Sequence, residues 1–265
     1  SSQCMFSKAL EYERAVGVDL WPDAPPVEGI GFTVPHPEQP GEKLFSWAGR
    51  LDQPAYAIDQ RIKFPALIET FQQNGGEVVF EEADIAALER YSLESELVIV
   101  AAGKGEIARA FERDAERSTY AEPQRALALT YVHGFEPSPD FSRVAFNMIP
   151  GIGEFFVFPA ATISGDCHIF VFEGVPGGPL DRWQGLTPEQ HLEASLDFLR
   201  TYLPWEAERA TNVSLTDDLG VLQGRFAPTV RHPVMELPSG RTVLGMADVV
   251  VLNDPITGQG SNNAS

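Results

Sequence analysis

The sequence contains only two cysteines, Cys4 and Cys167, which lie far apart along its 265 residues. Two distant thiols form neither a disulfide framework nor a zinc motif, and this scarcity favours a reducing, cytoplasmic location. The sequence also lacks a signal peptide, a lipidation motif and any apolar run as long as the ~18 residues of a membrane-spanning helix. We therefore expect no membrane association.

Positive charge is scarce as well, because 19 Lys and Arg residues face 38 Asp and Glu residues, for a formal net charge of -19. Such a chain repels phosphate backbones and anionic lipid surfaces. The composition therefore predicts no nucleic-acid partner and no binding to a membrane surface. The composition is compatible with small neutral or aromatic ligands.

Several signatures of catalysis are missing from the sequence. The Gly-x-Ser-x-Gly motif that exposes a nucleophilic serine does not occur, nor does a Walker-type lysine loop. The five histidines show neither helical pairing nor a neighbouring Cys-x-x-Cys pair. We predict no metal site and no catalytic side chain.

Apolar residues are plentiful: 43% of the chain is hydrophobic and 17 residues are Phe, enough for a sizeable core in one large or two ordinary domains. The order of the expected elements predicts an α/β fold of the α+β kind. In the first half we expect a helix over 8–15, a hairpin from strands over 29–34 and 43–47, a helix from the Asp59 cap to residue 74, and strands over 77–80 and 97–102.

The second half predicts a mostly antiparallel sheet, because short strands follow one another between Pro/Gly turns. A capping box at Thr187-Pro188-Glu189-Gln190 starts a helix among them. The expected strands cover residues 125–132, 143–149, 154–158, 168–172 and 221–230. Phenylalanines recur at period two along these strands, among them Phe146, Phe156 and Phe158. These rings either line an apolar ligand site or form core.

A turn of the dinucleotide-binding type, Gly103-Lys104-Gly105-Glu106-Ile107-Ala108, follows the apolar run 97–102. The carboxylate that should end the next strand is absent, because Glu122 precedes the strand over 125–132 instead of closing it. An NAD-dependent oxidoreductase built on this turn is therefore a less favoured alternative.

The last stretch of the chain has the most informative sequence pattern. A β-branched strand leads to Asp248, and Asn253-Asp254-Pro255 then opens the run Gly258-Gln259-Gly260-Ser261-Asn262, which predicts a turn followed by a helix. A helix beginning there would aim free backbone N–H groups at whatever lies in front of it. The glycines would let a flat ligand approach the backbone. An ordinary strand–helix corner is the other interpretation.

This stretch resembles the second flavin fingerprint of the FAD-dependent aromatic monooxygenases, in particular the oxygenase component of styrene and indole monooxygenases. In that family the aspartate holds the ribose or ribityl chain of FAD, and the Pro-x-x-Gly-Gln-Gly loop borders the isoalloxazine ring. Ala247 stands where the family usually has Gly. The resemblance implies FAD as the cofactor, with these candidate contacts: Asp248, Pro255, Gly258, Gln259, Gly260, Ser261, Asn262, Gly103 and Arg61. Phe146, Phe156, Phe158 and Pro255 are the candidate substrate contacts.

The resemblance further implies the epoxidation of a small aromatic alkene, or oxidation of indole, through a flavin C4a-hydroperoxide. A separate NADH-dependent flavin reductase would supply the reduced FAD. Such chemistry belongs to the flavin and requires no nucleophile or general base from the protein.

By the same resemblance, residues 1–24, 52–120 and 236–265 form a FAD-binding domain of the aromatic-hydroxylase type, and residues 25–51 and 121–235 form a substrate-binding sheet domain. The family begins with a strand, a Gly-x-Gly-x-x-Gly turn and a helix that are not in this sequence. We therefore expect an internal piece of a longer oxygenase. A substrate-binding module without turnover is the alternative from another class, and the sequence leaves the oligomeric state open, a homodimer included.

Overall fold

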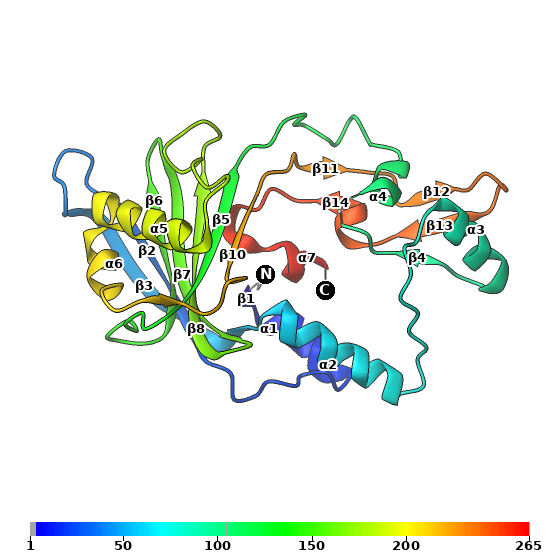
Figure 1. Ribbon diagram of the computed structural model, residues 1–265, viewed down its shortest axis with the longest axis horizontal. Helices are drawn as coiled ribbons and strands as arrows, with labels where there is room; N and C mark the ends of the chain where they lie inside the picture. The colour runs from blue at the N-terminus through cyan, green and yellow to red at the C-terminus, as the bar shows by residue number, and fades with distance from the viewer. Residues whose placement is uncertain (1–3, 104, 265) are drawn as a thin grey trace. The chain divides into compact units, whose positions relative to one another are not determined.

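The computed structural model describes residues 4–103 and 105–264, and the chain divides into two compact units (Figure 1). The first unit contains the chain up to Gly75 together with Arg125–Arg225, and the second contains Gly76–Gln124 and the chain from Phe226 on. Each unit has its own hydrophobic core.

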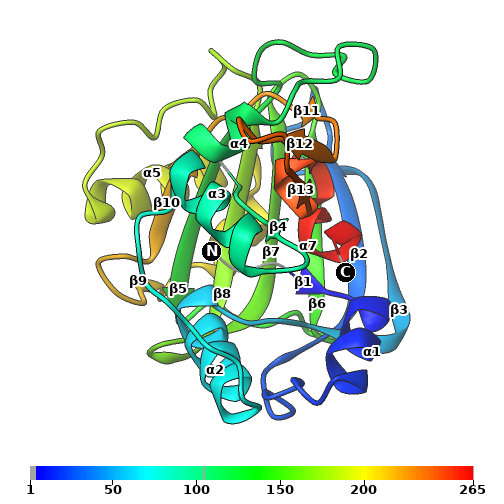
Figure 2. The ribbon, with the colours of Figure 1, turned by 90° about the vertical axis from the view of Figure 1, so that its right-hand side faces the viewer.

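The first unit is built on a nine-stranded sheet, as far as the described residues show, whose strand order can be followed in Figures 1 and 2. The order is β1-β3-β2-β6-β7-β8-β5-β10, with the short β9 also paired to β5. All neighbours are antiparallel except β2 and β6, which confirms the predicted mostly antiparallel sheet. The strands are β1 (Cys4–Met5), β2 (Pro26–Pro35), β3 (Lys43–Ala57), β5 (Ala126–His133), β6 (Arg143–Ile149), β7 (Gly153–Thr162), β8 (Gly165–Gly174), β9 (Ser214–Leu215) and β10 (Val221–Gly224).

Two helices cover one face of this sheet, α5 (Pro188–Tyr202) and the short α6 (Pro204–Arg209) (Figure 1). The predicted capping box starts α5: the Thr187 hydroxyl accepts from the Gln190 backbone N–H, and the Gln190 side chain accepts from the Thr187 N–H. Phe198 and Leu199 on α5 pack on Phe155, Phe170 and other rings of the strands below them. This face therefore forms the larger core of the unit.

The opposite face of the sheet has a second core, which includes Phe156, Phe158 and Ile169. The helices α1 (Ser7–Ala15) and α2 (Gln60–Gln73) flank the ends of β1 and β3. Asp59 caps α2, as predicted, by accepting from the Arg61 backbone N–H at 2.9 Å.

The compact units divide the chain differently from the predicted domains. β3 runs unbroken from Lys43 to Ala57, so no boundary falls at residue 51, and β1 pairs with its end through Cys4 and Ala57. The described residues before 25 and the stretch 52–75 therefore lie with the large sheet. Residues 121–124 and 226–235 lie in the second unit.

The second unit contains a three-stranded sheet of order β12-β13-β4 and the pair β11-β14 within its described residues. Its core gathers Leu88, Val100, Phe111 and Val243 with their neighbours. Its elements are α3 (Ile85–Glu94), β4 (Ile99–Val100), α4 (Glu106–Ala110), β11 (Thr229–Val230), β12 (Val234–Glu236), β13 (Thr242–Gly245), the 3-10 turn η1 (Ala247–Val249), β14 (Val251–Leu252), the 3-10 turn η2 (Ile256–Gly258) and α7 (Gly260–Ala264).

Three strand predictions need correction. Residues 77–80 form no strand, and Val79 and Phe80 are 65% and 83% exposed, so they have no sheet to pack on. The predicted strand 97–102 pairs only through Ile99 and Val100. The predicted strand 221–230 is two strands in different units, β10 and β11, with Pro228 between them, which cannot donate a ladder hydrogen bond.

Among the described residues, none of the helices combines the length and the apolar character that crossing a bilayer requires. Within residues 4–103 and 105–264, no three His, Cys, Asp or Glu side chains gather closely enough to hold a metal ion.

Candidate functional site

The second unit brings two predicted cofactor contacts, Gly103 and Asp248, together at one edge of its sheet. β4 and β13 are parallel neighbours, with Val100 opposite Gly245, so their carboxyl ends lie level. Gly103 follows β4 and Asp248 follows β13, and a Cβ added to Gly103 would lie 3.9 Å from Oδ2 of Asp248. Ligands of open α/β sheets bind outside the carboxyl ends of parallel strands, which makes this edge the candidate cofactor site.

A cleft of about 480 Å³ opens at the same edge. Asp248 and Gly260, both predicted, line it together with the amide side chains of Asn253 and Asn263. The remaining lining residues are Pro233, Gly245, Met246, Ala247, Val250, Val251 and Ala264. The cleft thus has an apolar wall and a few polar groups, the usual composition of a small-molecule site.

Asp248 is available to a ligand. Its side chain is exposed, and no hydrogen bond or ion pair engages the carboxylate among the described residues. The neighbouring residue Ala247 has φ +55°, and it is the one non-glycine residue with a positive φ in the described chain. Sequence reasoning noted alanine at this position but had no signal for its left-handed conformation.

The other predicted cofactor residues of this unit lie next to the cleft and do not line it. Pro255 and Gly258 belong to the turn around η2, where the Gly258 N–H donates to the Pro255 carbonyl at 2.8 Å and Gly258 takes φ +64°. Gln259 separates η2 from α7, and Ser261 and Asn262 lie within α7. The predicted helix after this turn is present as α7, over five described residues.

The turn after β4 gives little support to nicotinamide binding. Lys104 lies outside the described residues, and α4 begins at Glu106 after Gly105, which has φ +120°. A dinucleotide-binding fold needs the strand directly after this helix to lie in the same sheet, parallel to β4. In the described chain the sheet holds only β12, β13 and β4, and the strand that follows α4 is β5 of the other unit.

The first unit carries three of the four predicted substrate contacts, Phe146, Phe156 and Phe158, on one sheet face, whereas Pro255 lies in the second unit. Phe146 and Phe156 are direct cross-strand neighbours on β6 and β7, and their rings stack with centroids 5.5 Å apart. Phe146 also stacks on Phe32 of β2 at 5.6 Å, and Phe32 stacks on Trp47 of β3 at 6.4 Å. We call Trp47, Phe32, Phe146 and Phe156 the aromatic row. Phe158 lies beside it, with its ring 6.2 Å from that of Phe156.

The exposure of the side chains increases along the aromatic row from Phe156 to Trp47. Phe156 is 6% exposed, Phe32 and Phe146 are half-buried, and Trp47 is 50% exposed. Sequence reasoning missed Phe32 and Trp47, although both lie in the predicted hairpin, because their register with β6 cannot be read from local spacing. Phe170 and Phe172, which share the period-two pattern, lie in the core under α5 on the other face.

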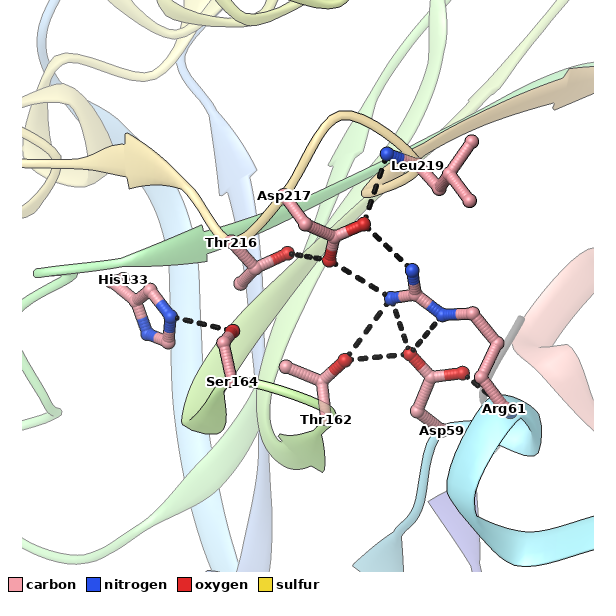
Figure 3. A network of polar contacts seen from close by, with 8 residues as sticks. All are labelled: Asp59, Arg61, His133, Thr162, Ser164, Thr216, Asp217 and Leu219. Atoms are coloured by element: carbon pink, nitrogen blue, oxygen red, sulfur yellow. Dashed lines mark hydrogen bonds and ion pairs between the residues drawn. The ribbon is translucent and has the colours of Figure 1, made fainter. Parts of the chain in front are cut away.

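Arg61, the last predicted cofactor contact, is engaged within the first unit (Figure 3). Its guanidinium donates to Oδ2 of Asp59 at 2.7 and 2.9 Å, to both carboxylate oxygens of Asp217 at 2.7 and 3.1 Å, and to the Thr162 hydroxyl at 3.1 Å. Thr162 donates to Asp59 at 2.6 Å. We call Asp59, Arg61, Thr162 and Asp217 the arginine network.

The arginine network joins the start of α2 to the end of β7 and to the loop between β9 and β10 (Figure 3). Burial would raise the pKa of Asp59, but hydrogen bonds from Arg61 and Thr162 outweigh it and hold this pKa below its usual value. The hydrogen bonds that Arg61 donates, first to Asp217 and then to Asp59, raise its pKa. Asp248 and the cleft lie in the other unit.

Comparisons with known proteins relate the chain to styrene monooxygenases. Residues 103–209 match the family "Styrene monooxygenase A putative substrate binding domain". Styrene monooxygenase StyA of Pseudomonas fluorescens is 29% identical over 263 residues, which cover 97% of this chain and 62% of that protein. A second StyA, from a Pseudomonas species, is 28% identical over the same share of both chains. The chain therefore spans less than two thirds of the length of these relatives.

Solved structures with a similar fold include a flavin-dependent brominase and a hydroxylase. The flavin-dependent brominase Bmp2 aligns with a TM-score of 0.64 at 13% identity, over 100% of this chain and 66% of that chain. The 2,6-dihydroxypyridine-3-hydroxylase of Arthrobacter nicotinovorans gives a TM-score of 0.62 at 14% identity, over 100% and 70%. These matches confirm the predicted fold class. The chain is thus similar to styrene monooxygenase StyA over nearly its whole length, and its residues 103–209 match the substrate-binding family of that enzyme.

Proposed function

We propose that the protein acts as the FAD-dependent oxygenase of a two-component monooxygenase that epoxidises a small aromatic alkene. The observation that carries this proposal is the exposed Asp248 carboxylate, which is unpaired among the described residues, in the cleft where β4 and β13 end. The similarity to StyA and the fold shared with flavin-dependent enzymes support it.

The residues around Asp248 fit the polar part of FAD. A carboxylate accepts hydrogen bonds from hydroxyl groups, and the ribose and ribityl chain of FAD offers several. Gly103 has no side chain beside Asp248, so a ligand can approach the backbone there. Asn253 and Asn263 add amide donors and acceptors to the same cleft. These residues would hold and orient the cofactor.

Bound reduced FAD would supply electrons to O2, and overall FADH2, O2 and an alkene would give FAD, water and an epoxide. This reaction requires no nucleophile or general base from the protein. The protein would bind the flavin and the alkene, hold them in a fixed relative orientation and exclude water. The absence of a candidate catalytic side chain from the sequence is compatible with that division of work.

The aromatic row fits the substrate side of the proposal. Rings stacked 5.5 to 6.4 Å apart form a continuous apolar row, which favours small uncharged aromatic compounds through burial and ring contacts. A carboxylate on the ligand would lose hydration there without gaining a partner, at a cost of about 1–3 kcal/mol or more. Styrene and indole meet this requirement, whereas benzoate does not.

Flavin titration tests the proposal. We expect FAD to bind, monitored by its fluorescence, and Asp248→Ala to weaken binding about tenfold, the loss of one or two charge-assisted hydrogen bonds. Glu94→Ala is the matched control, because it removes the same charge from an exposed position on α3 of the same unit. Equal affinities of the two variants would contradict the role of Asp248.

A turnover assay tests the reaction itself. The chain would be mixed with chemically reduced FAD, O2 and styrene, and the epoxide would be detected by chromatography. Supplying reduced FAD removes the reductase from the assay, and NADH in its place should not be consumed. Epoxide formed no faster than in a mixture without protein would favour the alternative, a substrate-binding module without turnover, which the match of residues 103–209 to a substrate-binding family supports.

We further propose a separate NADH-dependent flavin reductase as the partner protein. The cytoplasmic location expected from the two distant cysteines and the homodimer remain predictions.

A further inference from the structure

We propose that Ala247 is a positioning residue: its left-handed backbone conformation holds Asp248 in the cleft beside Gly103. This inference rests on the proposed cofactor role of Asp248. The starting observation is φ +55° at Ala247, a left-handed conformation that is unfavourable for an L-residue with a Cβ. Such a residue persists only where the surrounding structure fixes it.

Hydrogen bonds fix the chain on both sides of Ala247. Before it, the Gly245 N–H donates to the Pro233 carbonyl at 2.7 Å, and the Met246 N–H donates to the Val100 carbonyl at 2.9 Å. After it, the Val250 N–H donates to the Ala247 carbonyl at 2.9 Å, and Val250 accepts from the Arg231 N–H at 2.7 Å. The direction of the chain must therefore change within η1.

The side chains within η1 show what this turn achieves. Val249 is fully buried in the core with Phe111 and Val243, and its carbonyl accepts from the Arg231 guanidinium at 3.3 Å. Asp248, one residue earlier, is exposed and lines the cleft. With Met246 bonded to β4 and Val249 anchored in the core, the left-handed turn at Ala247 leaves Asp248 on the cleft side. A right-handed conformation would break one of these anchors or move the carboxylate.

Two substitutions of similar size separate the backbone effect from bulk. Ala247→Asn tolerates the left-handed conformation, whereas Ala247→Val carries a β-branched side chain that resists it. Both enlarge the side chain on the cleft wall. If Ala247 positions Asp248, FAD affinity should fall about tenfold in Ala247→Val and stay within about threefold in Ala247→Asn.

A double-variant cycle then distinguishes positioning from a general loss of structure. In the Asp248→Ala background, Ala247→Val should cause no further loss of FAD affinity, since the group that it misplaces is gone. Amide hydrogen exchange over residues 242–252 reports whether the local fold survives. If Ala247→Val proves unfolded, Ala247→Gly keeps the test, because glycine adopts this conformation freely and should bind FAD as wild type does.

The outcomes separate this inference from the proposed function. Equal FAD affinity of the Asn and Val variants, or additive losses in the double variant, would overturn the positioning role while leaving the cofactor site intact. Unchanged affinity in Asp248→Ala would overturn the cofactor site itself. A tenfold loss in Asp248→Ala, reproduced by Ala247→Val and absent from Ala247→Asn, would establish both.

Discussion

Removing the Arg61 side chain should destabilise the first unit strongly, because the buried Asp59 carboxylate would lose its positively charged partner. Asp59 is 1% exposed, and without the Arg61 guanidinium its side chain would keep, among the described residues, only the Thr162 hydroxyl and the backbone N–H of residue 61 as donors. Breaking a buried ion pair from one side costs about 3–5 kcal/mol. The Arg61 and Asp217 side chains are 27% and 21% exposed, so water compensates in part. We therefore expect Arg61→Met to lower the free energy of unfolding by about 3 kcal/mol.

Urea denaturation followed by tryptophan fluorescence suits this measurement. The chain has 4 tryptophans, Trp21, Trp47, Trp183 and Trp205, and all of them lie in the first unit. Arg200→Met on α5 is the control with the same change of charge. Its partners Glu193 and Asp197 are 61% and 57% exposed, and surface pairs of this kind contribute about 0–1 kcal/mol.

The network also predicts a non-additive pair. Asn at position 59 keeps the helix cap and removes the buried charge, so Asp59→Asn should recover about 2 kcal/mol in the Arg61→Met background. If Arg61→Met costs no more than Arg200→Met, or if the two network changes simply add, the reasoning from burial is wrong.

Three further predictions concern buried groups and the aromatic row. Burial lowers the pKa of His168, with a contribution from Arg209, and that of His191, each to about 4, so both are neutral in the folded protein at pH 7. In the unfolded chain the two histidines bind protons below about pH 6.5, so each histidine should lower the free energy of unfolding by up to about 3 kcal/mol as the pH falls from 6.5 to 4. Denaturation at each pH measures this loss, and a free energy of unfolding that does not change with pH would contradict it. Burial raises the pKa of both Cys4 and Cys167 to about 12, so neither thiol should react with a disulfide reagent at pH 8 until urea unfolds the chain. Phe146→Ala should weaken binding of styrene or indole in calorimetric titration about tenfold and leave benzoate binding weak, whereas tighter binding of benzoate to the unchanged chain would refute the apolar site.

The elements that could be predicted from the sequence are those with local determinants. The strands from Ala126 to Gly174 lie where alternating apolar residues meet Pro/Gly turns, and α5 starts at its capping box. The strand predicted over 77–80 failed, because an apolar pair such as Val79-Phe80 forms a strand only when a neighbour offers hydrogen bonds. The full length of β3 was missed because Pro54 looks like a break. Its missing N–H is tolerated near the end of a strand whose outer side pairs, among the described residues, only with the two residues of β1.

The candidate sites depend on long-range pairing that no local pattern contains. The Arg61 and Asp217 pair spans 156 positions, so the helix pattern around Arg61 could suggest a free guanidinium but not its partners. Phe32 reaches Phe146 only through the parallel pairing of β2 with β6.

Asp248 shows most clearly where sequence reasoning ends. Its residue type and the polar run after it single it out, whereas its neighbour Gly103 is brought to it by the parallel register of β4 and β13. The conformation that exposes it belongs to Ala247, a residue type whose intrinsic preference argues against a positive φ. Local preference and tertiary structure therefore disagree at that residue, and the disagreement lies beside the candidate cofactor contact, where strained backbone conformations concentrate in functional sites.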